Sequence, residues 1–296
     1  SMSDLDFQDE FRHAQATVQG VRLHYAEPDV EPDGRPLVLF LHGFPEFWYS
    51  WRHQLPALAA AGYRAVAPDL RGYNRSDKPR KVADYRVEVL ADDVAALIEA
   101  LGHRKAVVVG HDWGGVVAWF FAMRHPSLLE RLVVMNAPHP AHYLPMVGDP
   151  VQLRRSWYIL FFQLPHLAER VFERNDFAHT RALLRNDTQR KGAFTEQELD
   201  RYVSAWRGSS RAMMSYYRAL LRRNPFALRE TFRPIERPVQ VIWGMHDLAL
   251  DLRYAEPPAK WVWDLRMEFL DDASHWVQND RPERVNDLLL DFLRPR

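Results

Sequence analysis

The chain contains a series of short apolar runs that have the length of β-strands and are separated by polar segments. The runs at 37–41 and 106–109 contain no polar side chain, which is typical of strands buried on both faces of a parallel sheet. Further strand-length runs lie at 64–68, 132–135, 239–243 and 266–269. These runs predict the strands of one sheet, and a hairpin around Gly20 is predicted before them.

The segments between the runs repeat their apolar residues at helical spacing. Helices are predicted at 51–61 and 87–101, each followed by a glycine that can end it, and at 114–125 and 281–293. Strands that alternate with helices in this way predict an α/β fold. Its central sheet should be mostly parallel and flanked by helices on both faces.

The alternation is interrupted once, between about Pro140 and Pro238. This stretch has no clear buried strand, is rich in aromatic residues and arginine, and shows a helical pattern. We therefore expect an all-helical insertion after the sixth strand. The predicted domains are a core formed by residues 1–139 and 239–296 and a helical cap (lid) formed by residues 140–238.

The composition excludes several classes of function. Lys and Arg number 39 and Asp and Glu number 39, so the chain lacks the basic excess of a nucleic-acid-binding protein. It has no cysteine, which excludes disulfides and thiolate metal sites and fits a reducing compartment. Residues 1–12 are acidic, and no apolar run is long enough to span a membrane. We therefore expect a cytoplasmic protein without a signal peptide or membrane anchor.

Residues 107–115 read Val-Val-Val-Gly-His-Asp-Trp-Gly-Gly, which predicts a strand, a tight turn and the start of a helix. This matches the nucleophile elbow Gly-x-Ser-x-Gly, with Asp112 in place of the serine. The glycines allow strand and helix to approach closely, and the helix N-terminus favours an anion. Asp is also a preferred N-cap residue, so a helix cap is the alternative. The flanking Gly110 and Gly114 favour the nucleophile.

Two downstream residues occur in the order that a nucleophile elbow requires, with an acid before a histidine. Asp247 and His275 each follow a predicted strand. Asp251 and Asp264 are weaker candidates for the acid. His246 is expected to have a structural role because it lies on the loop of the acid.

Two backbone N–H groups are placed to form an oxyanion hole beside Asp112. They belong to Phe44, which follows the first buried strand, and to Trp113. His42 is expected to brace the loop that carries Phe44. Asn136 ends a neighbouring strand, but it has no charge and is given no role.

Five segments together resemble the α/β-hydrolase family and, within it, the epoxide hydrolases. The two most specific are His42-Gly-Phe-Pro-Glu-Phe-Trp-Tyr-Ser-Trp51 and Gly110-His-Asp-Trp-Gly-Gly115. The others are Asp69-Leu-Arg-Gly-Tyr73, Asn136-Ala-Pro-His-Pro140 and Ser274-His-Trp-Val-Gln278. The similarity covers nearly the whole chain and implies an α/β-hydrolase fold with a lid over the nucleophile.

The resemblance also implies two lid tyrosines that face the nucleophile. Tyr158 and Tyr217 match this pattern, and Tyr216 is the alternative for the second position. Tyrosines at helical spacing are otherwise typical of a helical core, so this assignment depends on the resemblance.

An aspartate at the elbow changes the expected chemistry. It is ionised near neutral pH and can attack an sp³ carbon that bears a leaving group, whereas attack on an ester would give an anhydride. With the resemblance, we expect Asp112 to open a small-molecule epoxide and form an alkyl ester while Tyr158 and Tyr217 protonate the alkoxide. His275, oriented by Asp247, would activate water to hydrolyse the ester to a vicinal diol. No metal or organic cofactor is needed.

Other classes of enzyme share parts of this pattern. A haloalkane dehalogenase would use the Trp113 indole to hold halide, but it usually adds an Asn where this chain has Phe44. A haloacetate dehalogenase typically has an arginine near the nucleophile, where this chain has Trp113 and Val116. Esterases and perhydrolases usually carry serine at the elbow.

A non-catalytic receptor or scaffold on the same fold is disfavoured by the complete set of Asp112, Asp247 and His275. The sequence leaves the oligomeric state open, with a homodimer as one option.

Overall fold

The computed structural model describes residues 10–295. The predictions made for residues 1–9, including the absence of a signal peptide, lie outside the described residues. The strands are β1 (Phe11–Val18), β2 (Val21–Pro28), β3 (Leu37–Leu41), β4 (Arg64–Pro68), β5 (Ala106–His111), β6 (Leu129–Met135), β7 (Val239–His246) and β8 (Leu265–Ser274).

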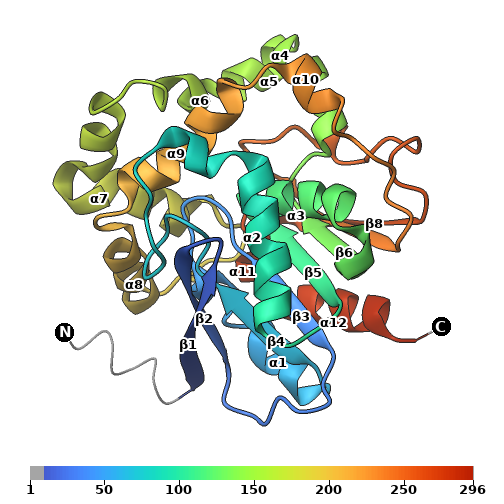
Figure 1. Cartoon of the computed structure of the whole chain (residues 1–296). Helices are drawn as coiled ribbons and strands as arrows, with labels where there is room; N and C mark the ends of the chain where they lie inside the picture. The colour runs from blue at the N-terminus through green and yellow to red at the C-terminus, as the bar shows by residue number, and fades with distance from the viewer. Residues whose placement is uncertain (1–9, 296) are drawn as a thin grey trace.

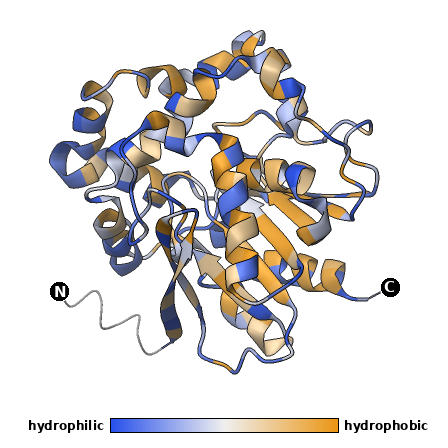
Figure 2. Ribbon diagram, viewed as in Figure 1, coloured by the Kyte–Doolittle hydropathy of each residue, from blue (hydrophilic) through white to orange (hydrophobic). Residues whose placement is uncertain are grey.

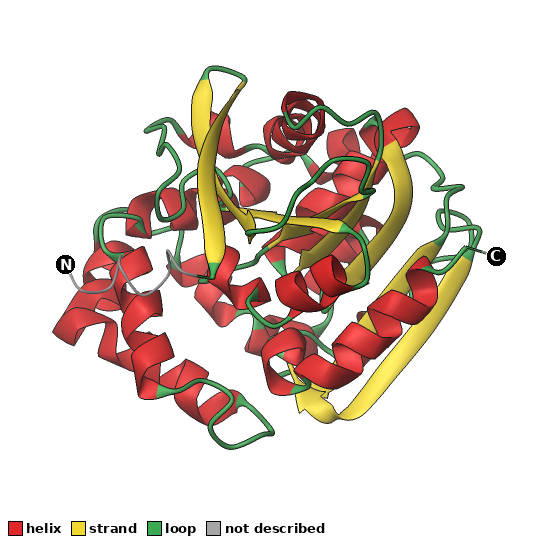
Figure 3. Ribbon diagram, turned by 90° about the horizontal axis from the view of Figure 1, so that it is seen from below, coloured by secondary structure: helices red, strands yellow, loops and turns green. Residues whose placement is uncertain are grey.

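The described strands form one eight-stranded sheet in the order β1-β2-β4-β3-β5-β6-β7-β8. β2 pairs antiparallel with β1 and β4, and every pair from β4 to β8 is parallel. Helices lie on both faces of the sheet (Figures 1 and 3). The predicted α/β architecture with a mostly parallel sheet is therefore confirmed.

The helices that flank the sheet pack against one another. The flanking helices are α1 (Gln54–Ala60), α2 (Val87–Ala100), α3 (Trp113–Arg124), α11 (Val277–Asp280) and α12 (Pro282–Leu293). α2 packs against α3, and α1 packs against α12. The helix predicted at 51–61 is divided into a 3₁₀ turn, Trp48–Trp51, and the shorter α1.

The central strands follow the predicted burial closely, and the edge strand does not. Every residue of β3 and β5 is buried, and these strands lie in the apolar interior (Figure 2). β8 is an edge strand and extends beyond the predicted strand at 266–269. Its exposed positions carry charged residues such as Asp271 and Asp272, which hide its extended conformation from an apolar pattern.

The chain between β6 and β7 forms helices above the carboxyl ends of the strands (Figure 1). They are α4 (Tyr143–Val147), α5 (Pro150–Arg155), α6 (Trp157–Phe161), α7 (Leu167–Asp187), α8 (Glu196–Trp206), α9 (Ser210–Leu221) and α10 (Pro225–Arg229). Ile235 then forms an isolated bridge with Val262. The division of the chain into a core domain and a cap domain stays a prediction.

None of the helices formed by residues 10–295 is both long enough and apolar enough to cross a membrane.

Candidate active site

Four polar side chains follow the carboxyl ends of four adjacent parallel strands. The last paired residues of β5 and β6 are followed directly by Asp112 and Asn136. The last paired residues of β7 and β8 are followed directly by Asp247 and His275. The register of the sheet therefore brings together residues that are far apart in the sequence.

The turn that carries Asp112 depends on close backbone contacts. Asp112 lies between β5 and α3 with φ at 54°, a conformation that is strained for a residue other than glycine. A Cβ atom on Gly110 would lie 2.2 Å from the carbonyl oxygen of Gly114, and one on Gly114 would lie 2.0 Å from that of Leu41. Glycine is therefore required at both positions, and the turn projects Asp112 above the sheet.

We expect Gly114→Ala to destabilise the fold by about 3 kcal/mol or more, because the methyl group meets backbone that is fixed in the central sheet. Urea unfolding followed by circular dichroism measures this effect. Gly148→Ala is the matched control, since its Cβ would lie 3.7 Å from the nearest atom and φ is not positive. An equal and small effect of both substitutions would contradict the steric argument.

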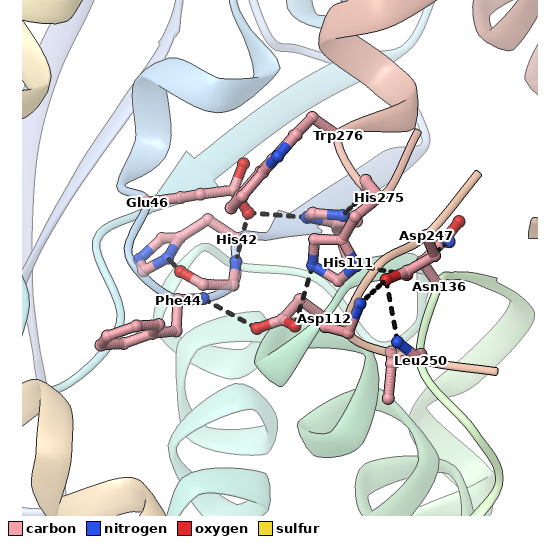
Figure 4. Close-up of polar contacts among 12 residues, drawn as sticks. His42, Phe44, Glu46, His111, Asp112, Asn136, Asp247, Leu250, His275 and Trp276 are labelled. Carbon is pink, nitrogen blue, oxygen red and sulfur yellow. Dashed lines mark hydrogen bonds and ion pairs between the residues drawn. The ribbon is translucent and has the colours of Figure 1, made fainter. Parts of the chain in front are cut away.

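The two carboxylate oxygens of Asp112 have different partners (Figure 4). The Phe44 N–H donates to Oδ2 at 2.9 Å, and His275 Nε2 lies 3.0 Å from Oδ1. Burial alone would raise the pKa of Asp112, but the hydrogen bond and charge of His275, with smaller contributions from His111 and the Phe44 amide, bring it below its ordinary value. Asp112 is therefore ionised near neutral pH.

The first donor predicted for the oxyanion hole, Phe44, thus reaches the nucleophile position directly. Trp113 supplies the first residue of α3 and directly follows Asp112. Its backbone N–H remains the predicted second donor.

His275 lies between two carboxylates. Its Nδ1 is 2.5 Å from Asp247 Oδ2, while Nε2 faces Asp112. Burial lowers the pKa of His275, but the charge of Asp247 and the hydrogen bonds to Asp112 and Asp247 outweigh it, so the pKa stands well above its ordinary value. The weaker candidates lie elsewhere. Asp251 accepts from the Arg253 N–H, and Asp264 is exposed.

The sequence prediction missed Asn136. Its Nδ2 donates to Asp247 Oδ2 at 2.9 Å, and its Oδ1 accepts the Gly244 N–H at 2.8 Å. Asn136 therefore ties the end of β6 to the strand and loop of Asp247. Its place directly after a buried strand was the available signal, and the prediction set it aside because Asn has no charge.

The sequence prediction also missed a pair of buried side chains beneath the site. The fully buried side chains of Glu46 and His111 meet, with Oε1 2.6 Å from Nδ1, and His111 Nε2 donates to the His275 carbonyl oxygen at 2.7 Å. Glu46 also accepts the Gly43 N–H at 3.0 Å. The pair connects the loop of Phe44, the turn at Asp112 and the loop of His275. His246 is exposed, and its Nε2 donates to the Asp271 carbonyl oxygen at 2.7 Å. Its structural role stays a prediction.

A cavity of about 480 Å³ extends from Asp112 into the helical insertion. Its walls are mainly apolar, and Tyr158 of α6 and Tyr217 of α9 both line it. Their rings are 6.0 Å apart at 84°. Burial comes first among the influences that raise the pKa of both phenols, and Asp112 contributes. Both hydroxyls therefore keep their protons near neutral pH and can donate hydrogen bonds.

Tyr216 is placed differently from Tyr217. Its hydroxyl donates to the Arg71 carbonyl oxygen at 2.5 Å, and its ring packs edge-on against Trp113 and Tyr73. Tyr216 does not belong to the cavity wall. Of the two neighbouring tyrosines, Tyr217 is the one that shares a cavity with Asp112.

Within residues 10–295, no group of three or more His, Asp or Glu side chains is arranged to hold a metal ion.

Comparison with known proteins agrees with this geometry. A profile of the family described as alpha/beta hydrolase fold matches residues 36–282. The chain is 41% identical to the AB hydrolase superfamily protein YfhM of Bacillus subtilis, over 93% of this chain and 95% of that protein. It is 39% identical to epoxide hydrolase 3 of Xenopus tropicalis, over 93% of this chain and 75% of that protein.

The solved structures indicate the same family. The crystal structure of the Bacillus megaterium epoxide hydrolase in complex with an inhibitor superposes with a TM-score of 0.84 at 32% identity, covering 95% of this chain and 99% of that one. The chain therefore belongs to the α/β-hydrolase family and, within it, to the epoxide hydrolase group.

Proposed function

We propose that this protein is an epoxide hydrolase that converts a small apolar epoxide and water to a vicinal diol. The observation that carries the proposal is the placement of Asp112. One of its oxygens is held by the Phe44 N–H, the other faces His275, and the same cavity presents Tyr158 and Tyr217. The relatives named epoxide hydrolase support the same reaction.

In the first half-reaction the Asp112 carboxylate attacks one carbon of the epoxide and the C–O bond of the ring breaks. Tyr158 and Tyr217 hold the ring oxygen, and a phenol proton passes to the alkoxide as it forms. The product is a hydroxyalkyl ester on Asp112, which contains all the atoms of the epoxide. Because Oδ2 accepts the Phe44 N–H, we assign Oδ1 as the attacking atom.

In the second half-reaction a water attacks the ester carbonyl carbon of Asp112. His275 removes a proton from this water, and the Asp247 carboxylate stabilises the imidazolium that results. The Phe44 N–H and the predicted Trp113 N–H stabilise the oxyanion. Collapse of the tetrahedral intermediate releases the diol and regenerates the carboxylate. The proton on the His275 imidazolium then neutralises the phenolate left by ring opening, which restores both groups for the next turnover.

Dehalogenation by the same aspartate is the second candidate. The side chain of Phe44 has no hydrogen-bond donor for halide, and its ring instead packs against Tyr217 with centroids 5.3 Å apart. Two phenols in the cavity fit an oxygen that gains charge during the reaction better than they fit a halide that leaves.

A substrate panel tests the proposal. Styrene-type and aliphatic epoxides are expected to give diols at catalytic rates, whereas bromoalkanes and haloacetates of the same size should release little halide. Diol formation is followed by chromatography and halide release by ion-selective electrode. Halide release without diol formation would overturn the assignment of the substrate.

We also propose the cap arrangement of residues 140–238 over the core formed by residues 1–139 and 239–296, because the insertion supplies most of the cavity wall.

A cytoplasmic location fits the absence of cysteine from the sequence. A homodimer stays a prediction, to be tested by light scattering.

A further inference from the structure

The loop that carries Asp247 is short and irregular. It follows β7, and residues 247–251 form bends without regular secondary structure. Leu248 in this loop is 67% exposed. The position of the carboxylate therefore depends on contacts from neighbouring elements, and several of these come from α5, a six-residue helix of the insertion.

Gln152 of α5 binds this loop at two points. Its side chain is 1% exposed, and it uses both ends of its amide. Nε2 donates to the Ala249 carbonyl oxygen at 2.9 Å, and Oε1 accepts the Asp251 N–H at 2.9 Å. Both partners are backbone groups. Gln152 therefore fixes the path of the loop backbone independently of the side chains that the loop carries.

The two ends of α5 add further contacts. At the C-terminal end, Arg155 Nη1 donates to the backbone carbonyl oxygen of Asp247 at 2.7 Å. At the N-cap, Asp149 Oδ2 accepts from Arg253 and from the Tyr254 hydroxyl, each at 2.5 Å. The helix is thus bound to the chain on both sides of the bends.

The peptide groups held by Gln152 adjoin those that hold the acid. Oδ1 of Asp247 accepts the N–H groups of Ala249 at 2.8 Å and Leu250 at 2.9 Å. A shift of this segment would move the two N–H donors, and the carboxylate would turn away from His275 Nδ1. Contacts from the insertion therefore reach the histidine through two backbone amides.

We propose that Gln152 and Arg155 are positioning residues of the insertion that keep Asp247 aligned with His275 for hydrolysis of the ester. The proposal rests on the proposed function. Attack by Asp112 on the epoxide does not use His275 as a base, whereas hydrolysis does. The two residues should therefore act on the second half-reaction much more than on the first.

Misplacement of Asp247 should also change the pKa of His275. In the free protein both Asp112 and Asp247 raise the pKa of His275 against the effect of burial. In the ester the charge of Asp112 is absent, so Asp247 is the remaining carboxylate in contact with the imidazole. A misplaced Asp247 should lower the pKa of His275. Since neutral His275 is the active base, the acid limb of the ester-hydrolysis rate should move to lower pH.

The test uses Gln152→Leu and Arg155→Met in the full chain, with rapid-quench measurement of ester formation and ester decay. Displacement of Asp247 from His275 should slow decay of the ester by about 10-fold or more. The rate of ester formation should stay within about 3-fold of the parent rate. The ester then accumulates during turnover. Arg155→Lys, which keeps a donor, should restore most of the decay rate.

Two control variants separate positioning from general stability. Gln240→Leu removes another fully buried glutamine from β7, whose amide donates to the Leu288 carbonyl oxygen at 3.4 Å. Arg154→Met removes an exposed arginine from α5 itself. In both controls the ratio of the rate of ester formation to the rate of ester decay should equal that of the parent protein.

The proposal is wrong if Gln152→Leu slows both half-reactions equally, or if only the melting temperature changes. NMR titration of His275 provides a readout without substrate, in which Gln152→Leu should lower its pKa and Gln240→Leu should not. If the parent protein forms no ester with any epoxide, the proposed function fails. The titration still decides whether α5 aligns Asp247 with His275.

Discussion

His275→Gln is expected to reduce steady-state turnover of an epoxide by about 10³-fold and to leave an ester on Asp112, because removal of a general base is worth 10²–10⁴-fold. Attack by Asp112 needs no base, so the first half-reaction survives. Intact-protein mass spectrometry should show a mass gain equal to that of the whole epoxide, since ring opening expels no fragment. A haloalkane would instead add its alkyl group without the halogen.

Two variants support the interpretation of this result. Asp112→Asn combined with His275→Gln should give no adduct, which places the ester on Asp112. His246→Gln should turn over normally, because this neighbouring histidine is exposed and its ring donates to the Asp271 carbonyl oxygen. A His275→Gln protein that turns over slowly without any adduct would refute the two-step mechanism.

Removal of both cavity phenols, Tyr158→Phe with Tyr217→Phe, is expected to lower turnover by about 10³-fold or more by slowing ring opening. The epoxide oxygen would gain negative charge in an apolar cavity with no acid to protonate it, and loss of such acid catalysis is worth 10²–10⁴-fold. Rapid-quench experiments should show slow ester formation and no accumulated ester, the reverse of the His275→Gln result.

Tyr216→Phe is the matched control for the phenols. It removes the hydroxyl that donates to the Arg71 carbonyl oxygen and leaves the cavity wall unchanged. We expect a loss of stability of about 1 kcal/mol and nearly normal turnover. The tyrosine assignment is wrong if the double variant turns over at the parent rate. It is also wrong if Tyr216→Phe slows ester formation more than the double variant does.

The sequence predicted the parts of the fold that depend on the local pattern of apolar and polar residues. β3 and β5 are buried on both faces, and burial on both faces leaves an uninterrupted apolar run. Asp112, Asp247 and His275 were predicted because each follows a strand and their order along the chain is informative. β8 was predicted too short, because the exposed Asp271 and Asp272 interrupt the apolar pattern of this edge strand.

Residues whose roles depend on register or on docking of the insertion could not be predicted. Asn136 meets Asp247 only because β6 and β7 are neighbours in the sheet. Gln152 reaches the loop of Asp247 only through the way α5 docks. Tyr216 and Tyr217 are adjacent on one helix, and helical periodicity does not decide which of them faces a cavity.

The direct pairing of β6 with β7 has a consequence for how the protein is made. Their pairing residues, such as Met135 and Ile242, lie on either side of the whole helical insertion. Strands so far apart in the chain must close a long loop before they pair, and such non-local pairing slows folding. During synthesis Asp112 leaves the ribosome well before Asp247 and His275. The nascent chain thus carries an incomplete candidate site until the last strands emerge and join the sheet.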